Sequence, residues 1–225
     1  MISIIVPAFN EEDRIKPFLR ELNDCLNDIN HEIIVVDDGS IDNTGRVAKE
    51  FGAKVLSYNK NKGKGVAIKT GVRHAKGEYI IFMDADGSIH PSNIKNVVKF
   101  LERYDIVVGS KFIRGTETII KQPVIRDITA FFFNLFVNIL FHIQYSDYLC
   151  GCKGFRREAA KRIFSFLMTE RWIFDVEVFL LANKFNLTIK EIPITWSYVG
   201  GSKIIKDIPR IFLNLIKFKK GCRNY

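Results

Sequence analysis

Glu78-Tyr79-Ile80-Ile81-Phe82-Met83-Asp84-Ala85-Asp86-Gly87 carries the strongest structural signal in the chain. Its apolar run, 79–83, predicts a buried strand that ends in two aspartates separated by one small residue. Residues i and i+2 of a strand point to the same side, so both carboxylates can reach one ligand. Such oxygen ligands suit a hard divalent cation that carries a phosphorylated molecule. A turn is the alternative, because Asp and Gly are common turn residues, and the segment alone does not separate the two interpretations.

Outward from this segment, the chain alternates between strand-like and helix-like patterns. Short apolar runs predict further strands at 2–6, 32–36, 54–57 and 105–109, the first of them stopped by Pro7. Apolar residues at three- and four-residue steps predict a helix after each of the first four strands. This alternation predicts the α/β class: a mainly parallel central sheet with helices on both faces.

Polar side chains follow three of these strands at the point where each strand ends. They are Asn10 and Glu11, then Asp37 and Asp38, then Asp84 and Asp86. Ligands of open α/β sheets bind beyond the carboxyl ends of the strands. A set of simple turns does not predict this recurrence, so the pattern favours a nucleotide and metal site.

Composition limits the class of protein. The 225 residues suffice for one large domain, or one domain with a small appendage, and an apolar fraction of 47% excludes global disorder. Neither a disulfide framework nor a zinc site is indicated by the spacing of Cys25, Cys150, Cys152 and Cys222, which favours a reduced, cytosolic setting. The chain enters a strand at once, so we expect no secretory peptide. The net charge of +9, concentrated after Lys203, indicates an anionic partner.

Four motifs in the first half resemble family 2 inverting glycosyltransferases, whose fold is the GT-A nucleotide-binding sandwich. They are Pro7-Ala8-Phe9-Asn10-Glu11, Val35-Val36-Asp37-Asp38-Gly39-Ser40, Asn61-Lys62-Gly63-Lys64-Gly65 and Asp84-Ala85-Asp86. The second half is similar to the dolichyl-phosphate glucosyltransferase branch. The similar segments are Asp147-Tyr148-Leu149-Cys150-Gly151-Cys152-Lys153, Arg171-Trp172-Ile173-Phe174-Asp175-Val176-Glu177 and Trp196 with Gly201-Ser202-Lys203. The related dolichyl-phosphate mannose synthases carry an Arg where Ser197 or Tyr198 stands here.

The resemblance implies transfer of a hexose from a nucleoside-diphosphate sugar to dolichyl (polyisoprenyl) phosphate, with inversion at the anomeric carbon. The product would be a lipid-linked sugar donor for protein glycosylation. UDP-glucose is the favoured donor, and UDP-N-acetylglucosamine or GDP-mannose are the alternatives. Because the departing diphosphate gains negative charge, a Mg²⁺ or Mn²⁺ ion is expected as cofactor.

The resemblance also assigns site residues. Asp86 is expected to be the main metal ligand, with Asp84 and Ser88 beside it. The predicted nucleotide-sugar site consists of Pro7, Phe9, Glu11, Val36, Asp38, Lys64, Asp84, Ala85, Asp86, Ser88 and Lys203. The acceptor phosphate is expected at Arg126 and at Lys111, which stands where the family usually has an Arg and lacks its planar fork. A plain surface lysine remains the alternative for Lys111 and Lys203.

Asp175 is the fourth predicted catalytic residue, with Asp86, Lys111 and Arg126. A phosphate acceptor is already ionised near neutral pH, so the reaction needs no general base. Asp175 is therefore expected either to orient basic groups or the sugar, or to be an acid at the start of a helix.

Two segments predict contact with a membrane. The apolar run 128–143 is shorter than the ~20 residues that normally span a bilayer, and Asn134, Asn138 and His142 form a polar seam along it. This pattern predicts a lipid-facing interfacial helix at about 125–143 within a catalytic domain of residues 1–205, although a buried core helix is the alternative. Residues 206–225 predict a basic amphipathic tail that binds anionic lipid. We therefore expect a peripheral protein on the cytoplasmic face of the membrane. A non-catalytic membrane-surface or nucleic-acid-binding protein is disfavoured, because it leaves the acidic strand ends unexplained.

Overall fold

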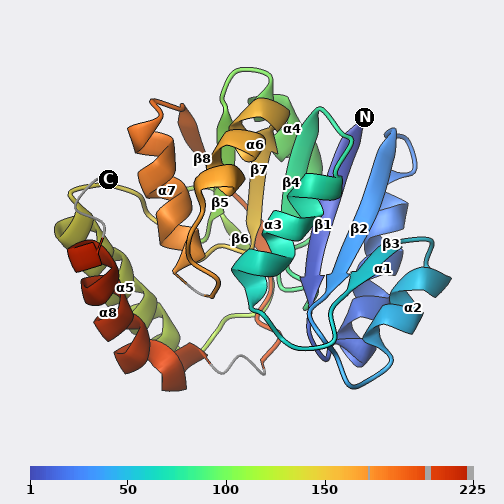
Figure 1. Cartoon of the computed structure of the whole chain (residues 1–225), viewed down its shortest axis with the longest axis horizontal. Coiled ribbons are helices and arrows are strands. Elements are labelled where there is room, and N and C mark those ends of the chain that lie inside the picture. The colour runs from blue at the N-terminus through green and yellow to red at the C-terminus, as the bar shows by residue number, and fades with distance from the viewer. Residues whose placement is uncertain (172, 201–203, 222–225) are drawn as a thin grey trace.

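The computed structural model describes residues 1–171, 173–200 and 204–221, and Figure 1 shows their arrangement. A seven-stranded sheet has the order β3-β2-β1-β4-β7-β5-β8. Its strands are β1 (Ile2–Ala8), β2 (His31–Asp37), β3 (Lys54–Ser57), β4 (Tyr79–Met83), β5 (Ile106–Ser110), β7 (Cys152–Arg156) and β8 (Ile189–Pro193). A small second sheet pairs β6 (Glu117–Thr118) with β9 (Thr195–Trp196).

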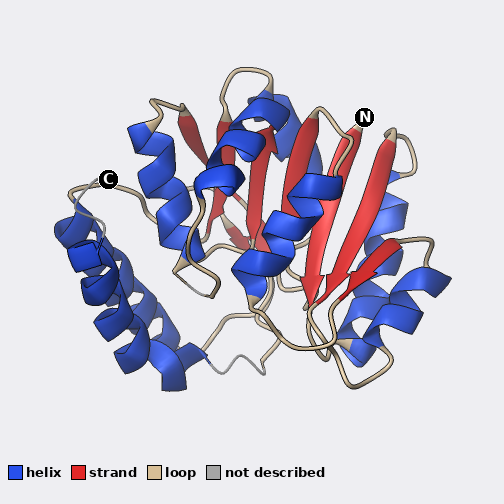
Figure 2. Cartoon of the chain, viewed as in Figure 1, coloured by secondary structure: helices blue, strands red, loops and turns tan. Residues whose placement is uncertain are grey.

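Helices cover both faces of the large sheet (Figure 2). They are α1 (Glu12–Leu26), α2 (Thr44–Glu50), α3 (Lys64–His74), α4 (Asn93–Leu101), α6 (Arg157–Phe166) and α7 (Phe174–Lys184). In Figure 1, α3, α6 and α7 lie in front of the sheet, whereas α1 and α4 lie behind it. The predicted α/β sandwich is therefore confirmed.

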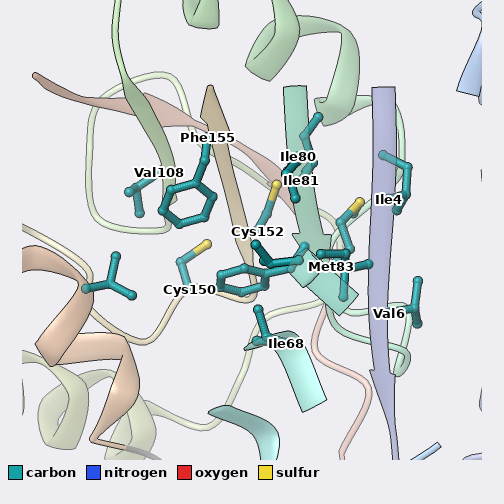
Figure 3. Packing of buried hydrophobic residues seen from close by; sticks show 14 of the residues in the cluster. Ile4, Val6, Ile68, Ile80, Ile81, Met83, Val108, Cys150, Cys152 and Phe155 are labelled. Carbon is teal, nitrogen blue, oxygen red and sulfur yellow. The ribbon is translucent and has the colours of Figure 1, made fainter. Parts of the chain in front are cut away.

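The parallel order is broken only once in the described part of the sheet. β7 runs antiparallel between β4 and β5, with Ile80 opposite Phe155 and Val107 opposite Gly154. Figure 3 shows Cys152 and Phe155 of β7 beside Ile80 and Ile81 of β4, in the centre of the core. This strand joins the two halves of the chain, because it brings residues after 150 next to the strand that leads into Asp84 and Asp86.

The prediction that Pro7 stops the first strand is wrong. β1 continues through Pro7 to Ala8 and stays paired with β2 up to Asp37. Its pairing with β4 ends earlier, at Ile5 opposite Phe82. Pro7 therefore lies where β1 has a partner on one side only, a position in which the missing N–H costs no ladder hydrogen bond.

Two long helices, α5 (Val124–Phe141) and α8 (Ile204–Gly221), lie side by side and apart from the sheet (Figure 1). Phe212 of α8 packs against Phe133 and Phe136 of α5, with ring centroids 6.0 and 4.5 Å apart. Among the described residues, α5 is the one helix long and apolar enough to cross a membrane by length and composition, and 17% of it is buried.

The polar seam of α5 faces the protein. Asn134 Nδ2 donates to Ser146 O at 2.7 Å, and Asn138 Oδ1 accepts from the amide of Tyr145 at 3.3 Å. The third predicted member, His142, instead ends the helix in the left-handed conformation with its side chain exposed. The opposite side of α5 presents Phe131, Phe132, Leu135 and Ile139 to the outside.

Candidate active site

Two cavities meet at the carboxyl end of β4. The first cavity, of about 450 Å³, contains most of the predicted nucleotide-sugar residues. These are Pro7, Phe9, Glu11, Asp38, Lys64, Asp84, Ala85 and Asp86. The strands β1, β2 and β4 end at the same edge of the sheet, so the three acidic strand ends predicted from the sequence lie together there.

The second cavity, of about 220 Å³, lies on the other side of the same two aspartates. Asp84, Asp86, Ser88, Lys111 and Arg126 line it. The rest of its wall is largely apolar and includes Phe133 of α5, Ile211 of α8, Leu149, Trp196 and Tyr198. Asp84 and Asp86 thus form the boundary between a cavity rich in charged side chains and one that reaches the helix pair.

Asp84 is held in place by two neighbours. Its Oδ1 forms an ion pair with Lys64 Nζ at 2.6 Å, and its amide donates to Gly151 O at 3.1 Å. A Cβ atom at Gly151 would lie 2.3 Å from Asp84 Oδ2, so only glycine leaves room for this carboxylate. Burial raises the pKa of Asp84, and Lys64 opposes that rise.

Lys64 is a cation among aromatic rings. Its Nζ lies 5.7 Å from the ring centre of Phe82 and 5.8 Å from that of Phe174. Burial alone would lower the pKa of Lys64, but Asp84 and then Asp175 outweigh it and raise the pKa above its ordinary value. Lys64 is therefore protonated and forms an ion pair with Asp84 in this structure.

Four carboxylates among the described residues line the first cavity, those of Glu11, Asp38, Asp84 and Asp86. Asp86 Oδ1 accepts from the amide of Ser88 at 2.9 Å, which fixes the turn after β4. Burial raises the pKa of Glu11 to about 7, against the opposing effect of its ion-pair partner Arg14, and Asp86 and Asp84 raise it further. A site where several carboxylates repel one another favours a bound cation.

The donor atoms fit a divalent ion that is shared with a phosphorylated ligand. Within the described residues, no group of three or more His, Cys, Asp or Glu side chains is arranged to hold a metal ion alone. The carboxylates of Asp84 and Asp86 and the hydroxyl of Ser88 nevertheless border one cavity. Mg²⁺ is commonly bound by one or two carboxylates together with substrate phosphates, and this set matches that mode.

Asp38 lines the first cavity and also holds a loop in place. The Asp38 carboxylate accepts from the amides of Lys62 and Gly63, at 2.7 and 2.8 Å, and so holds the loop before α3. Val36 is fully buried in β2 and lines neither cavity. Ser88 lines the second cavity and not the first. Lys203 lies outside the described residues.

Lys111 and Arg126, the two residues expected at the acceptor phosphate, both line the second cavity. The Nζ of Lys111 lies 5.2 Å from the ring centre of Trp196, and the guanidinium carbon of Arg126 lies 5.1 Å from that of Tyr198. Asp147, from the second-half motif, accepts from the Lys111 amide at 3.2 Å and lines the same cavity.

Asp175 lines neither cavity. It is 1% exposed near the start of α7, and it pairs at 2.5 Å with Lys153 of β7, which is fully buried. Lys153 also donates to Cys150 O at 2.9 Å, beside the Gly151 that accommodates Asp84. Asp175 therefore belongs to the packing behind the site.

Arg171 lines the first cavity, although the sequence predicts no role for it beyond its place in a motif. The sequence feature that could have pointed to Arg171 is a basic residue just before the helix that contains Asp175. Its position depends on which loops meet in three dimensions, and no periodicity reveals that.

Comparison with solved structures gives the class of protein to which this fold belongs. The structure is similar to that of glucosyl-3-phosphoglycerate synthase from Mycobacterium tuberculosis in complex with Mn²⁺, UDP-glucose and phosphoglyceric acid. The TM-score is 0.71 at 20% identity, over 98% of this chain and 80% of that chain. It is also similar to S. aureus TarS in complex with UDP-GlcNAc, with a TM-score of 0.63 at 21% identity, over 97% and 66% of the two chains. The architecture is that of the GT-A glycosyltransferases.

Sequence comparison then narrows the class. Residues 3–164 match Glycosyl transferase family 2, and the chain belongs to that family. The dolichyl-phosphate beta-glucosyltransferase of Dictyostelium discoideum is 34% identical over 93% of this chain and 73% of the relative. The human enzyme of the same name is 35% identical over 91% and 69%. The family resemblance predicted from the motifs is confirmed.

Proposed function

We propose that this protein transfers glucose from UDP-glucose to dolichyl phosphate, with inversion at the anomeric carbon. The observation that carries the proposal is that Asp84 and Asp86 border two cavities, one rich in charged side chains and one that reaches the helix pair α5–α8. The relatives named dolichyl-phosphate beta-glucosyltransferase, which align over nine-tenths of the chain, support both the sugar and the acceptor.

The first cavity takes the nucleotide sugar. Pro7 near the end of β1, with Phe9 and Glu11 just after that strand, contacts the nucleoside, while Asp38 holds the loop that ends at Gly63. Asp86, Asp84 and Ser88 hold the Mg²⁺ or Mn²⁺ ion, as the complexes of the M. tuberculosis neighbour suggest. When bound, the ion neutralises the charge that grows on the departing diphosphate.

The second cavity takes the lipid phosphate. Lys111 and Arg126 supply positive charge, and the apolar wall formed by Phe133, Leu149 and Ile211 accommodates the first part of the hydrocarbon chain. An oxygen of the lipid phosphate attacks the anomeric carbon, and the bond from that carbon to the diphosphate oxygen breaks with its electron pair leaving on the diphosphate. The attacking oxygen is already ionised, so no proton has to be removed. The burial of Asp175 against Lys153 fits a reaction without a general base.

The helix pair α5–α8 attaches the protein to the membrane as a peripheral protein on the cytoplasmic face. Seven apolar side chains of α5 are exposed, namely Val124, Ile125, Ile128, Phe131, Phe132, Leu135 and Ile139. Lys217, Lys219 and Lys220 near the end of α8 attract anionic headgroups. We assign residues 1–205 to the catalytic domain, which includes the lipid-facing helix α5, and residues 206–225 to a membrane-associating tail.

The test is a donor screen with the purified protein, Mn²⁺ or Mg²⁺ and dolichyl phosphate in vesicles. Labelled UDP-glucose should yield a glucosyl phospholipid, at a rate at least about tenfold above UDP-N-acetylglucosamine or GDP-mannose. A preference for one of the other donors would correct the sugar and keep the acceptor. The absence of lipid product with all three donors would refute the proposed function.

A further inference from the structure

The cations of the first cavity are not equally available to a ligand. Arg14, Lys64 and Arg171 are the basic side chains that the described residues contribute to its wall. Arg14 Nε pairs with Glu11 at 2.6 Å, and Lys64 pairs with Asp84 at 2.6 Å. Across the described ranges, Arg171 is exposed and takes part in none of the ion pairs. Arg171 is therefore the cation of this wall that can meet an anion without breaking a pair.

The loop that carries Arg171 is held by buried contacts. The carboxylate of Glu177, fully buried in α7, accepts from the amides of Met168 and Thr169 at 2.8 Å each, and from the Thr169 hydroxyl at 2.5 Å. On the other side, the amide of Gly65 donates to Glu170 O at 2.9 Å. The backbone next to Arg171 is thus fixed between α7 and α3.

Gly63 brings Arg171 close to the loop before α3. A Cβ atom at Gly63 would lie 2.6 Å from Glu170 O and 3.0 Å from Arg171 Cγ, so the two loops touch where only glycine fits. The Arg171 loop also occupies a backbone donor of α3. The amide of Gly65, in the first turn of that helix, already donates to Glu170 O. A helix N-terminus is a common anion site, but here one amide of α3 is occupied, and the Arg171 side chain begins beside it.

We propose that Arg171 binds the diphosphate of the nucleotide sugar and of the departing nucleotide. A guanidinium grips phosphate oxygens through two parallel N–H donors, which a lysine cannot do. This inference rests on the proposed function for the identity of the donor. It assigns to Arg171 the leaving-group side of the reaction, separate from Lys111 and Arg126 in the second cavity.

Titration calorimetry with UDP, UMP and uridine in Mn²⁺ buffer tests the assignment on the wild type, Arg171→Gln and Arg171→Lys. Arg171→Gln should weaken UDP binding by about 10- to 100-fold, UMP binding less, and uridine binding by less than twofold, because the lost contacts are charged hydrogen bonds to phosphate. Arg171→Lys should recover part of the loss. Arg20→Gln, an exposed arginine of α1 that lines neither cavity, is the matched control and should bind UDP like the wild type.

UDP affinity within twofold of the wild type for Arg171→Gln, or an equal loss for UDP and uridine, would overturn the assignment. Its failure is distinguishable from that of the proposed function. If UDP binding depends on Arg171 but no glucose reaches dolichyl phosphate, the inference stands and the proposed function falls. If the wild type does not bind UDP at all, both fall.

Discussion

Gly151 determines where the Asp84 carboxylate can lie. Its φ is not in the left-handed region, so Gly151→Ala carries no backbone strain, but the new methyl group would lie 2.3 Å from Asp84 Oδ2. Asp84 must move, and a displacement of about 1 Å in a catalytic group costs on the order of a hundredfold in rate. We predict that Gly151→Ala lowers kcat/KM for glucose transfer about a hundredfold and raises the metal concentration at half-maximal rate. Gly221→Ala is the control, because an added Cβ there meets none of the described residues within 4 Å, and equal rates for both variants would contradict the prediction.

Glu11 makes the metal-free protein sensitive to pH. Its pKa is raised from 4.5 to about 7, chiefly by burial, so its neutral form is favoured in the folded state. The stabilisation is complete below about pH 4.5 and is lost as the pH rises through 7. In EDTA, Glu11→Gln should therefore gain in melting temperature relative to the wild type between pH 5 and pH 8. A difference in melting temperature that is the same at both pH values would show that Glu11 does not titrate in this range.

At the scale of elements, β7 and α7 are joined by the buried pair Lys153–Asp175. Removing one member leaves the other charge buried and unpaired, at a cost of about 3–5 kcal/mol. Lys153→Met should lower the free energy of unfolding in urea by that amount. The double variant Lys153→Met/Asp175→Leu should recover more than half of it, because no charge remains. A loss below about 0.5 kcal/mol for Lys153→Met would mean that the pair does not hold β7 to α7.

The pair α5–α8 is the element expected to meet lipid. Phe131 and Phe132 are 60% and 57% exposed, and transferring each into an apolar phase is worth about 1.5–3 kcal/mol. Phe131→Ser/Phe132→Ser should weaken binding to anionic vesicles at least about tenfold in flotation, without lowering the melting temperature. Ile41→Ser removes a side chain that is 93% exposed in the loop after β2 and should leave flotation unchanged. If both variants float like the wild type, α5 does not contact the bilayer.

Across the whole molecule, the sequence predicted the local elements well and the long-range neighbours poorly. Strands β3 and β4 have the predicted bounds, because short apolar runs between turn residues leave little choice. β7 was not predicted, since a strand inserted antiparallel between β4 and β5 is selected by tertiary pairing.

The arrangement of the candidate active site could likewise be predicted only in part. The three acidic strand ends lie together because the sheet is parallel, and that follows from the pattern of elements. The pairing of Lys64 with Asp84, the room that Gly151 leaves, and the position of Arg171 depend on loops from opposite halves of the chain. No local pattern in the sequence contains that information.

The most direct test of the central claim is the rate of glucose transfer from UDP-glucose to dolichyl phosphate by the Asp86→Ala variant. Asp86 borders both cavities, and in the proposed reaction its carboxylate holds the ion at the junction of the two substrate sites. We predict a loss of at least about a thousandfold in kcat/KM relative to the wild type, and a similar loss for the wild type in EDTA. Full activity of Asp86→Ala with EDTA present would contradict the account.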